Sequence, residues 1–220
     1  MYGRVRYDRS PLSGSLRNSS ISFDDPRMPP LALLLLDYQS EIRNFVPDKT
    51  IFDAAVSNGA ELLAVARAQG PEKVVIAHVI VGGLRRSNEE LYSVVKESKF
   101  GNWIESFPAS LENPGIVESV TPLPGEKVHP RPRGSPFHDT DFNSFLRSKE
   151  VTRLILAGVA TSGAVLHTWR SALDADYEVE VVPQACADLN PEMHQILVEK
   201  FFNRFGEVLS VEEAKKQLAA

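Results

Sequence analysis

Short apolar runs alternate along the chain with longer segments in which apolar residues recur at helical spacing. The clearest run is Leu31–Leu36, which is apolar throughout and predicts a strand buried on both faces. Val74–Val81 predicts a second buried strand. Shorter strands are expected over residues 126–130, 154–157, 178–182 and 207–209.

The clearest helical segment covers residues 49–69, with Asp48 as its N-cap and Gly70 just past its end. Further helices are expected over residues 88–99, 139–149, 162–175 and 191–205. Because strands and helices alternate, the pattern predicts an α/β protein with a parallel sheet and helices on both faces. The carboxyl ends of the strands then share one edge, and ligands bind there where the strand order reverses.

Residues 1–30 differ from the rest of the chain. They contain six serines and five arginines and carry a net charge of +2, whereas residues 31–220 carry −7. We therefore expect a flexible N-terminal extension over residues 1–30 and one domain over residues 31–220. No apolar segment of the signal-peptide kind follows the start, so no secretory signal is expected.

The composition argues against several classes of protein. A net charge of −5 is unlike that of a nucleic-acid-binding protein, and the longest apolar run is far shorter than the ~20 residues that span a bilayer. The single cysteine, Cys186, excludes an intramolecular disulfide and a site built from several thiolates. We expect a cytoplasmic protein with a small-molecule ligand and no nucleic-acid or membrane partner.

Candidate functional side chains follow the ends of the predicted strands. Asp37 comes directly after the first strand, where it could cap a helix or act as a working carboxylate. Arg131 and Arg133 follow the third strand. The fourth ends in small residues, 158–164, whose N–H groups could approach a ligand. This turn lacks the G-x-G-x-x-G pattern of a dinucleotide site.

Three blocks of the sequence carry a family resemblance. They read LLLLDYQ at residues 33–39, RPRGSPF at residues 131–137 and AGVATSGAV at residues 157–165. Their order and spacing resemble the isochorismatase-like hydrolase superfamily, which also contains nicotinamidases and N-carbamoylsarcosine amidases. The resemblance covers about residues 31–210. It implies a three-layer α/β/α fold with a six-stranded parallel sheet, and a homodimer or higher homo-oligomer.

The cysteine enzymes of this superfamily use an Asp, a Lys and a Cys. By position, the resemblance assigns these three roles to Asp37, Arg131 and Ala164. Independently of these roles, the candidates for substrate binding are Gln39, Arg85, Arg133, Val159, Ala160, Thr161 and Gly163. Ala164 offers no nucleophile, so covalent thiol catalysis is not available at that position. The Asp-x-His of the nicotinamidase metal site has no counterpart near residues 48–75, so neither a metal nor another cofactor is expected.

Three functions remain open. True isochorismatases carry a small residue at the cysteine position, and this favours a thiol-independent hydrolase of a small anionic molecule. Asp37 would be its acid or base. Arg131 cannot give up its proton and is expected to lower the pKa of Asp37, which favours a base over an acid. The second possibility is an inactive protein that binds a metabolite or a protein partner. The third is a cysteine amidase using Cys186, which we expect to be structural.

Overall fold

The computed structural model describes residues 30–83, 98–105 and 115–220. Its centre is a six-stranded sheet in the order β3-β2-β1-β4-β5-β6, with every pair of strands parallel. The strands are β1 (Leu31–Leu36), β2 (Val74–Val81), β3 (Lys127–Arg131), β4 (Arg153–Val159), β5 (Glu178–Ala187) and β6 (Glu207–Val208). The parallel sheet predicted by the alternating pattern, and the six strands implied by the resemblance, are confirmed.

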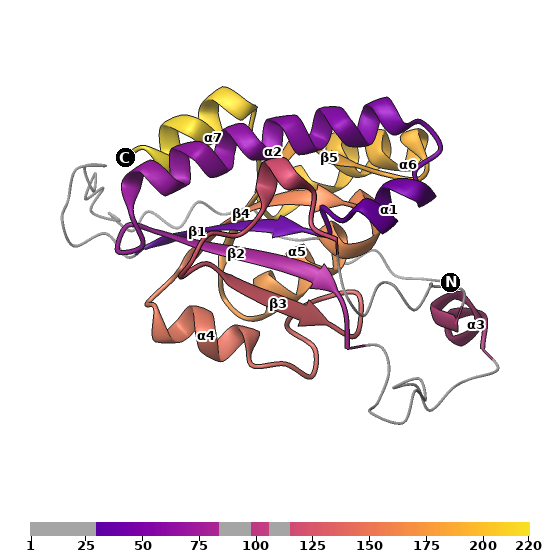
Figure 1. The fold of residues 1–220 in the computed structure, drawn as a ribbon, viewed down its shortest axis with the longest axis horizontal. Coiled ribbons are helices and arrows are strands. Elements are labelled where there is room, and N and C mark those ends of the chain that lie inside the picture. The colour runs from indigo at the N-terminus through magenta and orange to yellow at the C-terminus, as the bar shows by residue number, and fades with distance from the viewer. Residues whose placement is uncertain (1–29, 84–97, 106–114) are drawn as a thin grey trace, which may run out of the picture.

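Helices cover both faces of the sheet and complete a three-layer α/β/α architecture (Figure 1). One face carries α2 (Lys49–Gln69) and α7 (Val211–Leu218), and the other carries α4 (Phe142–Ser148) and α5 (Leu166–Asp174). The other α-helices are α1 (Ser40–Phe45), α3 (Lys99–Glu105) and α6 (Pro191–Ile196), and a 3₁₀ turn covers Glu118–Val120. Among the described residues, no helix has the length and apolar character needed to cross a membrane.

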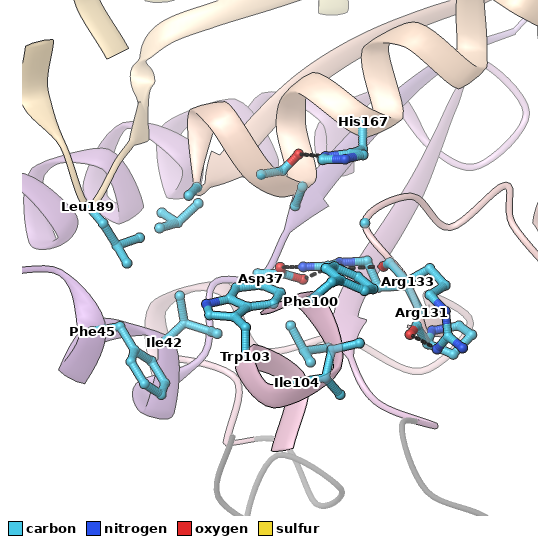
Figure 2. Close-up of a pocket in the computed structure, with 17 residues that line it drawn as sticks. Asp37, Ile42, Phe45, Phe100, Trp103, Ile104, Arg131, Arg133, His167 and Leu189 are labelled. Carbon is cyan, nitrogen blue, oxygen red and sulfur yellow. Dashed lines mark hydrogen bonds and ion pairs between the residues drawn. The ribbon is translucent and has the colours of Figure 1, made fainter. Parts of the chain in front are cut away.

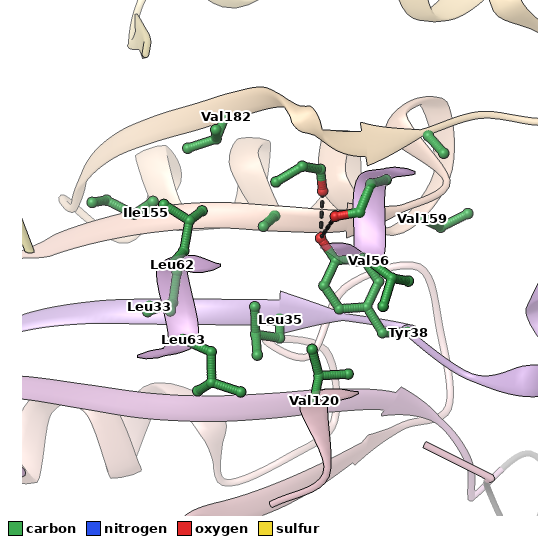
Figure 3. Packing of buried hydrophobic residues seen from close by; sticks show 14 of the residues in the cluster. Leu33, Leu35, Tyr38, Val56, Leu62, Leu63, Val120, Ile155, Val159 and Val182 are labelled. Carbon is green, nitrogen blue, oxygen red and sulfur yellow. Dashed lines mark hydrogen bonds between the residues drawn. The ribbon is translucent and has the colours of Figure 1, made fainter. Parts of the chain in front are cut away.

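The two faces of β1 supply two separate apolar clusters. Leu33 and Leu35 pack with Leu62 and Leu63 of α2 in the cluster shown in Figure 3. The alternate residues, among them Leu34, join the second cluster on the side of α4 and α5. Burial on both faces therefore explains why the sequence of β1 is apolar without interruption.

Helix α2 begins and ends as the sequence predicts. The side chain of Asp48 accepts a hydrogen bond from the backbone N–H of Thr50 at 2.9 Å, and Gly70 follows the helix with φ 83°. The hydroxyl of Tyr38, in the loop after β1, donates to the carbonyl oxygen of Ala185 in β5. Strand β1 and the loop after it are thus tied to β5 beneath α2.

Several element boundaries differ from the expectations. The helix expected over residues 139–149 is shorter, and the strand expected over 178–182 continues to Ala187. Helices α1 and α7 are additional. The start of α7 has a readable signal, because Ser210 and Glu213 form a capping box. The helix expected over 88–99 lies outside the described residues except at its end, as does the 1–30 extension except for Pro30.

The strand order reverses between β1 and β4. The chain moves outward from β1 through β2 to β3, then returns to the other side of β1 and continues through β4, β5 and β6. Leu36 and Gly158 are paired near the carboxyl ends of β1 and β4. In an open parallel sheet this reversal leaves a crevice at the carboxyl edge. The segments that begin with Asp37 and Ala160 therefore border the expected ligand site.

Candidate active site

A pocket of about 130 Å³ lies at this edge of the sheet (Figure 2). It is bordered by the ends of β1, β2, β3 and β4, by α1 and α3, and by the loop after β5. The predicted site residues that line it are Asp37, Arg131, Arg133, Val159, Ala160, Gly163 and Ala164. Segments far apart in the sequence thus converge on one cavity.

Asp37 and Arg131 form an ion pair in this pocket. Nε of Arg131 donates to Oδ1 of Asp37 at 3.1 Å, and Nη2 donates to Oδ2. The third nitrogen, Nη1, donates to the carbonyl oxygen of Arg133 at 2.5 Å. The side chains of Asp37 and Arg131 are only 2% and 11% exposed. Arg131 therefore orients the carboxylate, and all three of its nitrogens already donate within the protein.

The backbone of Asp37 contributes to this placement. Its N–H donates to the carbonyl oxygen of Val79 at 2.8 Å, which extends the pairing of β1 with β2 by one residue. Its φ of 56° lies in the left-handed region, which Asp tolerates better than most residues. The chain turns here from the strand toward α1. The carboxylate consequently sits where the sheet ends rather than inside either apolar cluster.

The pKa of the Asp37 carboxyl is raised above its ordinary value. Burial is the largest cause, and it outweighs the charge and hydrogen bonds of Arg131 and a backbone hydrogen bond from Val81, which lower the pKa. The expectation that Arg131 sets a lowered pKa is therefore wrong in its net direction. A raised pKa makes the ionised carboxylate a stronger base and also makes its protonated form more available, so the pKa by itself does not favour a base over an acid.

Ala164 belongs to the turn between β4 and α5. The turn, Thr161–Val165, is a π-helical segment interrupted at Gly163, where φ is −104° and ψ is −106°. It follows Gly158, whose φ is 153° and where a Cβ atom would lie 2.2 Å from the carbonyl oxygen of Leu36. Glycine at 158 therefore allows β4 to approach β1. The Ala164 methyl lines the pocket and supplies no nucleophile.

Cys186 lies elsewhere. It is buried in β5, paired in register with Gly158, and does not line the pocket. Burial raises the pKa of its thiol to about 12, and the carboxylate of Asp188 also raises it, against one backbone hydrogen bond from Gly158 that lowers it. Since the thiolate is the nucleophilic form, this cysteine has the properties of a structural residue.

Two of the predicted binding residues serve the scaffold. Gln39 is fully buried, and its Oε1 accepts a hydrogen bond from the backbone N–H of Val81 at 2.8 Å. Thr161 is also fully buried, with its Oγ1 2.7 Å from Nδ1 of His194. Neither lines the pocket. Arg85 lies outside the described residues.

The structure adds an apolar wall that the sequence motifs do not indicate. It consists of Ile42, Phe45, Phe100, Trp103, Ile104 and Leu189. Phe100, Trp103 and Ile104 share α3, and their spacing is the one signal that could have identified them. His167 also lines the pocket, with Nδ1 2.8 Å from the carbonyl oxygen of Gly163. In the described part of the chain, no three His, Cys, Asp or Glu residues gather as possible metal ligands.

Comparison with solved structures places this fold among known ones. An isochorismatase family protein from Burkholderia thailandensis superposes with a TM-score of 0.71 at 22% identity, covering 88% of this chain and 97% of that one. A cysteine hydrolase from Pseudomonas syringae pv. phaseolicola gives 0.71 at 19% identity, with coverage of 89% and 98%. N-carbamoylsarcosine amidase from Thermoplasma acidophilum gives 0.60 at 16%, with coverage of 84% and 98%. At these identities the likeness concerns the fold.

Sequence comparison reaches further. Ureidoacrylate amidohydrolase RutB from Methylobacterium radiotolerans is 34% identical over 103 residues, which are 45% of this chain and 40% of that protein. Its counterpart from Cronobacter sakazakii is 33% identical over 99 residues, 43% of each chain. The match thus spans less than half of these curated relatives. The model of the isochorismatase domain matches residues 31–213. Because this match covers most of the chain, the protein belongs to the isochorismatase family of hydrolases.

Proposed function

We propose that this protein hydrolyses a small molecule without a covalent thiol intermediate, with Asp37 as the general base. The observation that carries the proposal is the arrangement at one pocket, where a buried carboxylate held by Arg131 lies in a cavity that the methyl group of Ala164 also lines. The only thiol of the chain, that of Cys186, lies outside that pocket.

The chemistry follows from the pair. A water molecule gives a proton to the Asp37 carboxylate as its oxygen attacks the electrophilic carbon of the substrate. A new C–O bond forms, the bond to the leaving group breaks, and Asp37 returns the proton to that group. No other reactant is consumed. Arg131 contributes by keeping the carboxylate oriented and in the form that accepts a proton.

Arg133 is the cation that we assign to an anionic group of the substrate. It lines the same pocket, and its Nη1 donates to the carbonyl oxygen of Pro132 at 2.7 Å. Arg131 is less suited to this task, because its nitrogens already donate to Asp37 and to the carbonyl oxygen of Arg133. We therefore assign the binding of an anionic group to Arg133 instead of Arg131.

A second candidate is a binding protein without catalytic activity, and one observation favours it. Both oxygens of Asp37 accept hydrogen bonds from Arg131, so the carboxylate that should activate water is already engaged. Such a closed pair would shape a binding pocket equally well. The two candidates predict different outcomes in one experiment.

The test is turnover of a panel containing isochorismate, ureidoacrylate and small amides. We expect wild type to hydrolyse at least one compound and Asp37→Asn to be about 10²–10⁴-fold slower, the usual contribution of a general base. Asp53→Asn is the matched control, because Asp53 also pairs with an arginine, Arg43, but on the surface and outside the pocket. If wild type and Asp37→Asn bind a compound alike and neither turns it over, the binding protein is the correct function.

A further inference from the structure

Several exposed large apolar side chains gather at this pocket. Among the described residues, nine large hydrophobic side chains are exposed. Four of them line the pocket: Phe45, Phe100, Trp103 and Leu189. Phe100 is 50% and Trp103 53% exposed. Exposed apolar side chains scattered singly need no explanation, whereas a contiguous group around a cavity marks a place that meets an apolar partner.

The size of the cavity limits what that partner can be. Its volume of about 130 Å³ is close to that of an engineered apolar cavity of ~150 Å³ that binds benzene. The rings of Phe100 and Trp103 are stacked with centroids 5.9 Å apart and an angle of 29° between their planes. They present aromatic surface to the cavity, and aromatic rings associate by stacked or edge-to-face contacts. The space suits one aromatic ring.

The pocket also contains polar groups. In Figure 2, Asp37 and the guanidinium paired with it lie behind the rings of Phe100 and Trp103, while Ile42 and Phe45 extend to one side. A ligand that fills the pocket therefore meets the Asp37 carboxylate as well as apolar surface. Pockets built in this way hold the body of a ligand by apolar contact and orient it by a few polar groups.

We propose that the substrate carries an aromatic ring, which binds against Phe100 and Trp103 and presents the bond to be cleaved to Asp37. This inference rests on the proposed function for the position of the scissile bond, and on the apolar wall for the ring. It identifies the substrate class as an aryl amide, ester or ether. Because the cavity is about one ring in size, the ring is the main apolar group that it can hold, beside the anionic group assigned to Arg133.

Binding of four small probes separates ring recognition from charge recognition. Benzamide and benzoate carry the ring, acetamide and acetate lack it, and each pair contains one neutral compound and one anion. We expect both ring compounds to bind at least tenfold more tightly than their ringless partners by calorimetry or ligand-observed NMR. Equal affinity of benzoate and acetate, with no binding of benzamide, would show anion recognition alone and would overturn the inference.

Two variants test whether the wall is responsible. Trp103→Ala should weaken benzamide binding about tenfold. Phe205→Ala should leave it unchanged, because Phe205 is an aromatic residue that is 63% exposed and does not line this pocket. If both variants bind benzamide like wild type, the ring does not occupy the wall. If Trp103→Ala instead changes only the oligomeric state, a second copy of the chain covers the wall, and the inference fails.

These measurements need no turnover, so they stand apart from the test of the proposed function. Ring binding in a protein that hydrolyses nothing would refute the proposed hydrolysis and leave the aromatic ligand in place. Hydrolysis that depends on Asp37 but shows no preference for ring compounds would support the proposed hydrolysis and refute the aromatic substrate.

Discussion

Removing the guanidinium from Arg131 tests the buried ion pair most sharply. In Arg131→Met a side chain of similar length keeps the apolar stem but leaves the Asp37 carboxylate, whose side chain is 2% exposed, without a cation. Breaking a buried pair by deleting one partner costs about 3–5 kcal/mol. For a chain of this length, that loss corresponds to a fall in Tm of about 6–20 °C.

The loss should depend on pH, and its sign follows from the pKa of Asp37. Burial raises this pKa in the folded protein while Arg131 opposes the rise, so the pKa climbs further in the variant. A carboxyl whose folded pKa is raised loses stability as the pH increases from its unfolded pKa of ~3.9 through the folded value. The difference between wild type and variant should therefore be largest near pH 8 and should shrink toward pH 4.

Urea unfolding followed by far-UV circular dichroism at pH 4, 6 and 8 measures this difference. The matched control is Arg43→Met, which breaks an Arg–Asp pair whose side chains are 39% and 52% exposed. Exposed pairs contribute little to stability, so the control should stay near wild type at every pH. A loss of unfolding free energy in Arg131→Met that is no larger than in Arg43→Met would contradict this prediction. So would a loss that is the same at pH 4 and pH 8.

Three further predictions concern other parts of the molecule. Iodoacetamide should leave native wild type unlabelled, because the Cys186 thiol is buried and has a pKa of about 12. Ala164→Cys should gain one label, because residue 164 lines the pocket. Detection of labelled wild type by mass spectrometry would contradict this prediction. Burial raises the pKa of Glu126, but its hydrogen bonds outweigh this and lower it to about 2. Glu126→Gln should therefore destabilise the protein in urea at pH 7 and have a vanishing effect as the pH falls from about 4.5 to about 2, and an equal effect at pH 7 and pH 2.5 would argue against it. Gly59→Ala should lower the free energy of unfolding by about 1–3 kcal/mol, because its Cβ would lie 2.5 Å from the ring of Tyr38; a higher Tm would show that the ring can move.

Much of the fold can be predicted from the sequence, because a strand that is buried on both faces of the sheet is apolar without interruption. Leu31–Leu36 and Val74–Val81 are strands over the residues that the apolar pattern indicates. Asp48 and Gly70 likewise mark the beginning and the end of α2 at the positions that the sequence indicates. Parallel connectivity then brings the carboxyl ends of the strands to one edge. That reasoning places Asp37 and Ala164 near each other without any knowledge of side-chain contacts.

The remainder depends on contacts between distant segments. Arg131 bonds to Asp37 across 94 residues of sequence, and nothing local indicates that its nitrogens are already engaged. The direction in which the pKa of Asp37 shifts depends on burial of the carboxyl, and this burial is determined only by the fold. The apolar wall also depends on the fold, because it combines residues of α1, of α3 and of the loop after β5 at one pocket. The start of α7 is different, because its Ser210–Glu213 capping box is a local signal that the sequence does contain.

We propose that hydrolysis at this site needs Asp37 and no thiol. The chain contains one cysteine, so Cys186→Ala yields a protein without any thiol, and that residue lies between Ala185 and Ala187 in β5. The decisive measurement is kcat/KM of this variant, on whichever compound wild type hydrolyses, with its fold verified by circular dichroism. We expect a value within about twofold of wild type, because a tenfold change would need a change of about 1.4 kcal/mol in the activation barrier. A folded variant that has lost its activity would contradict it.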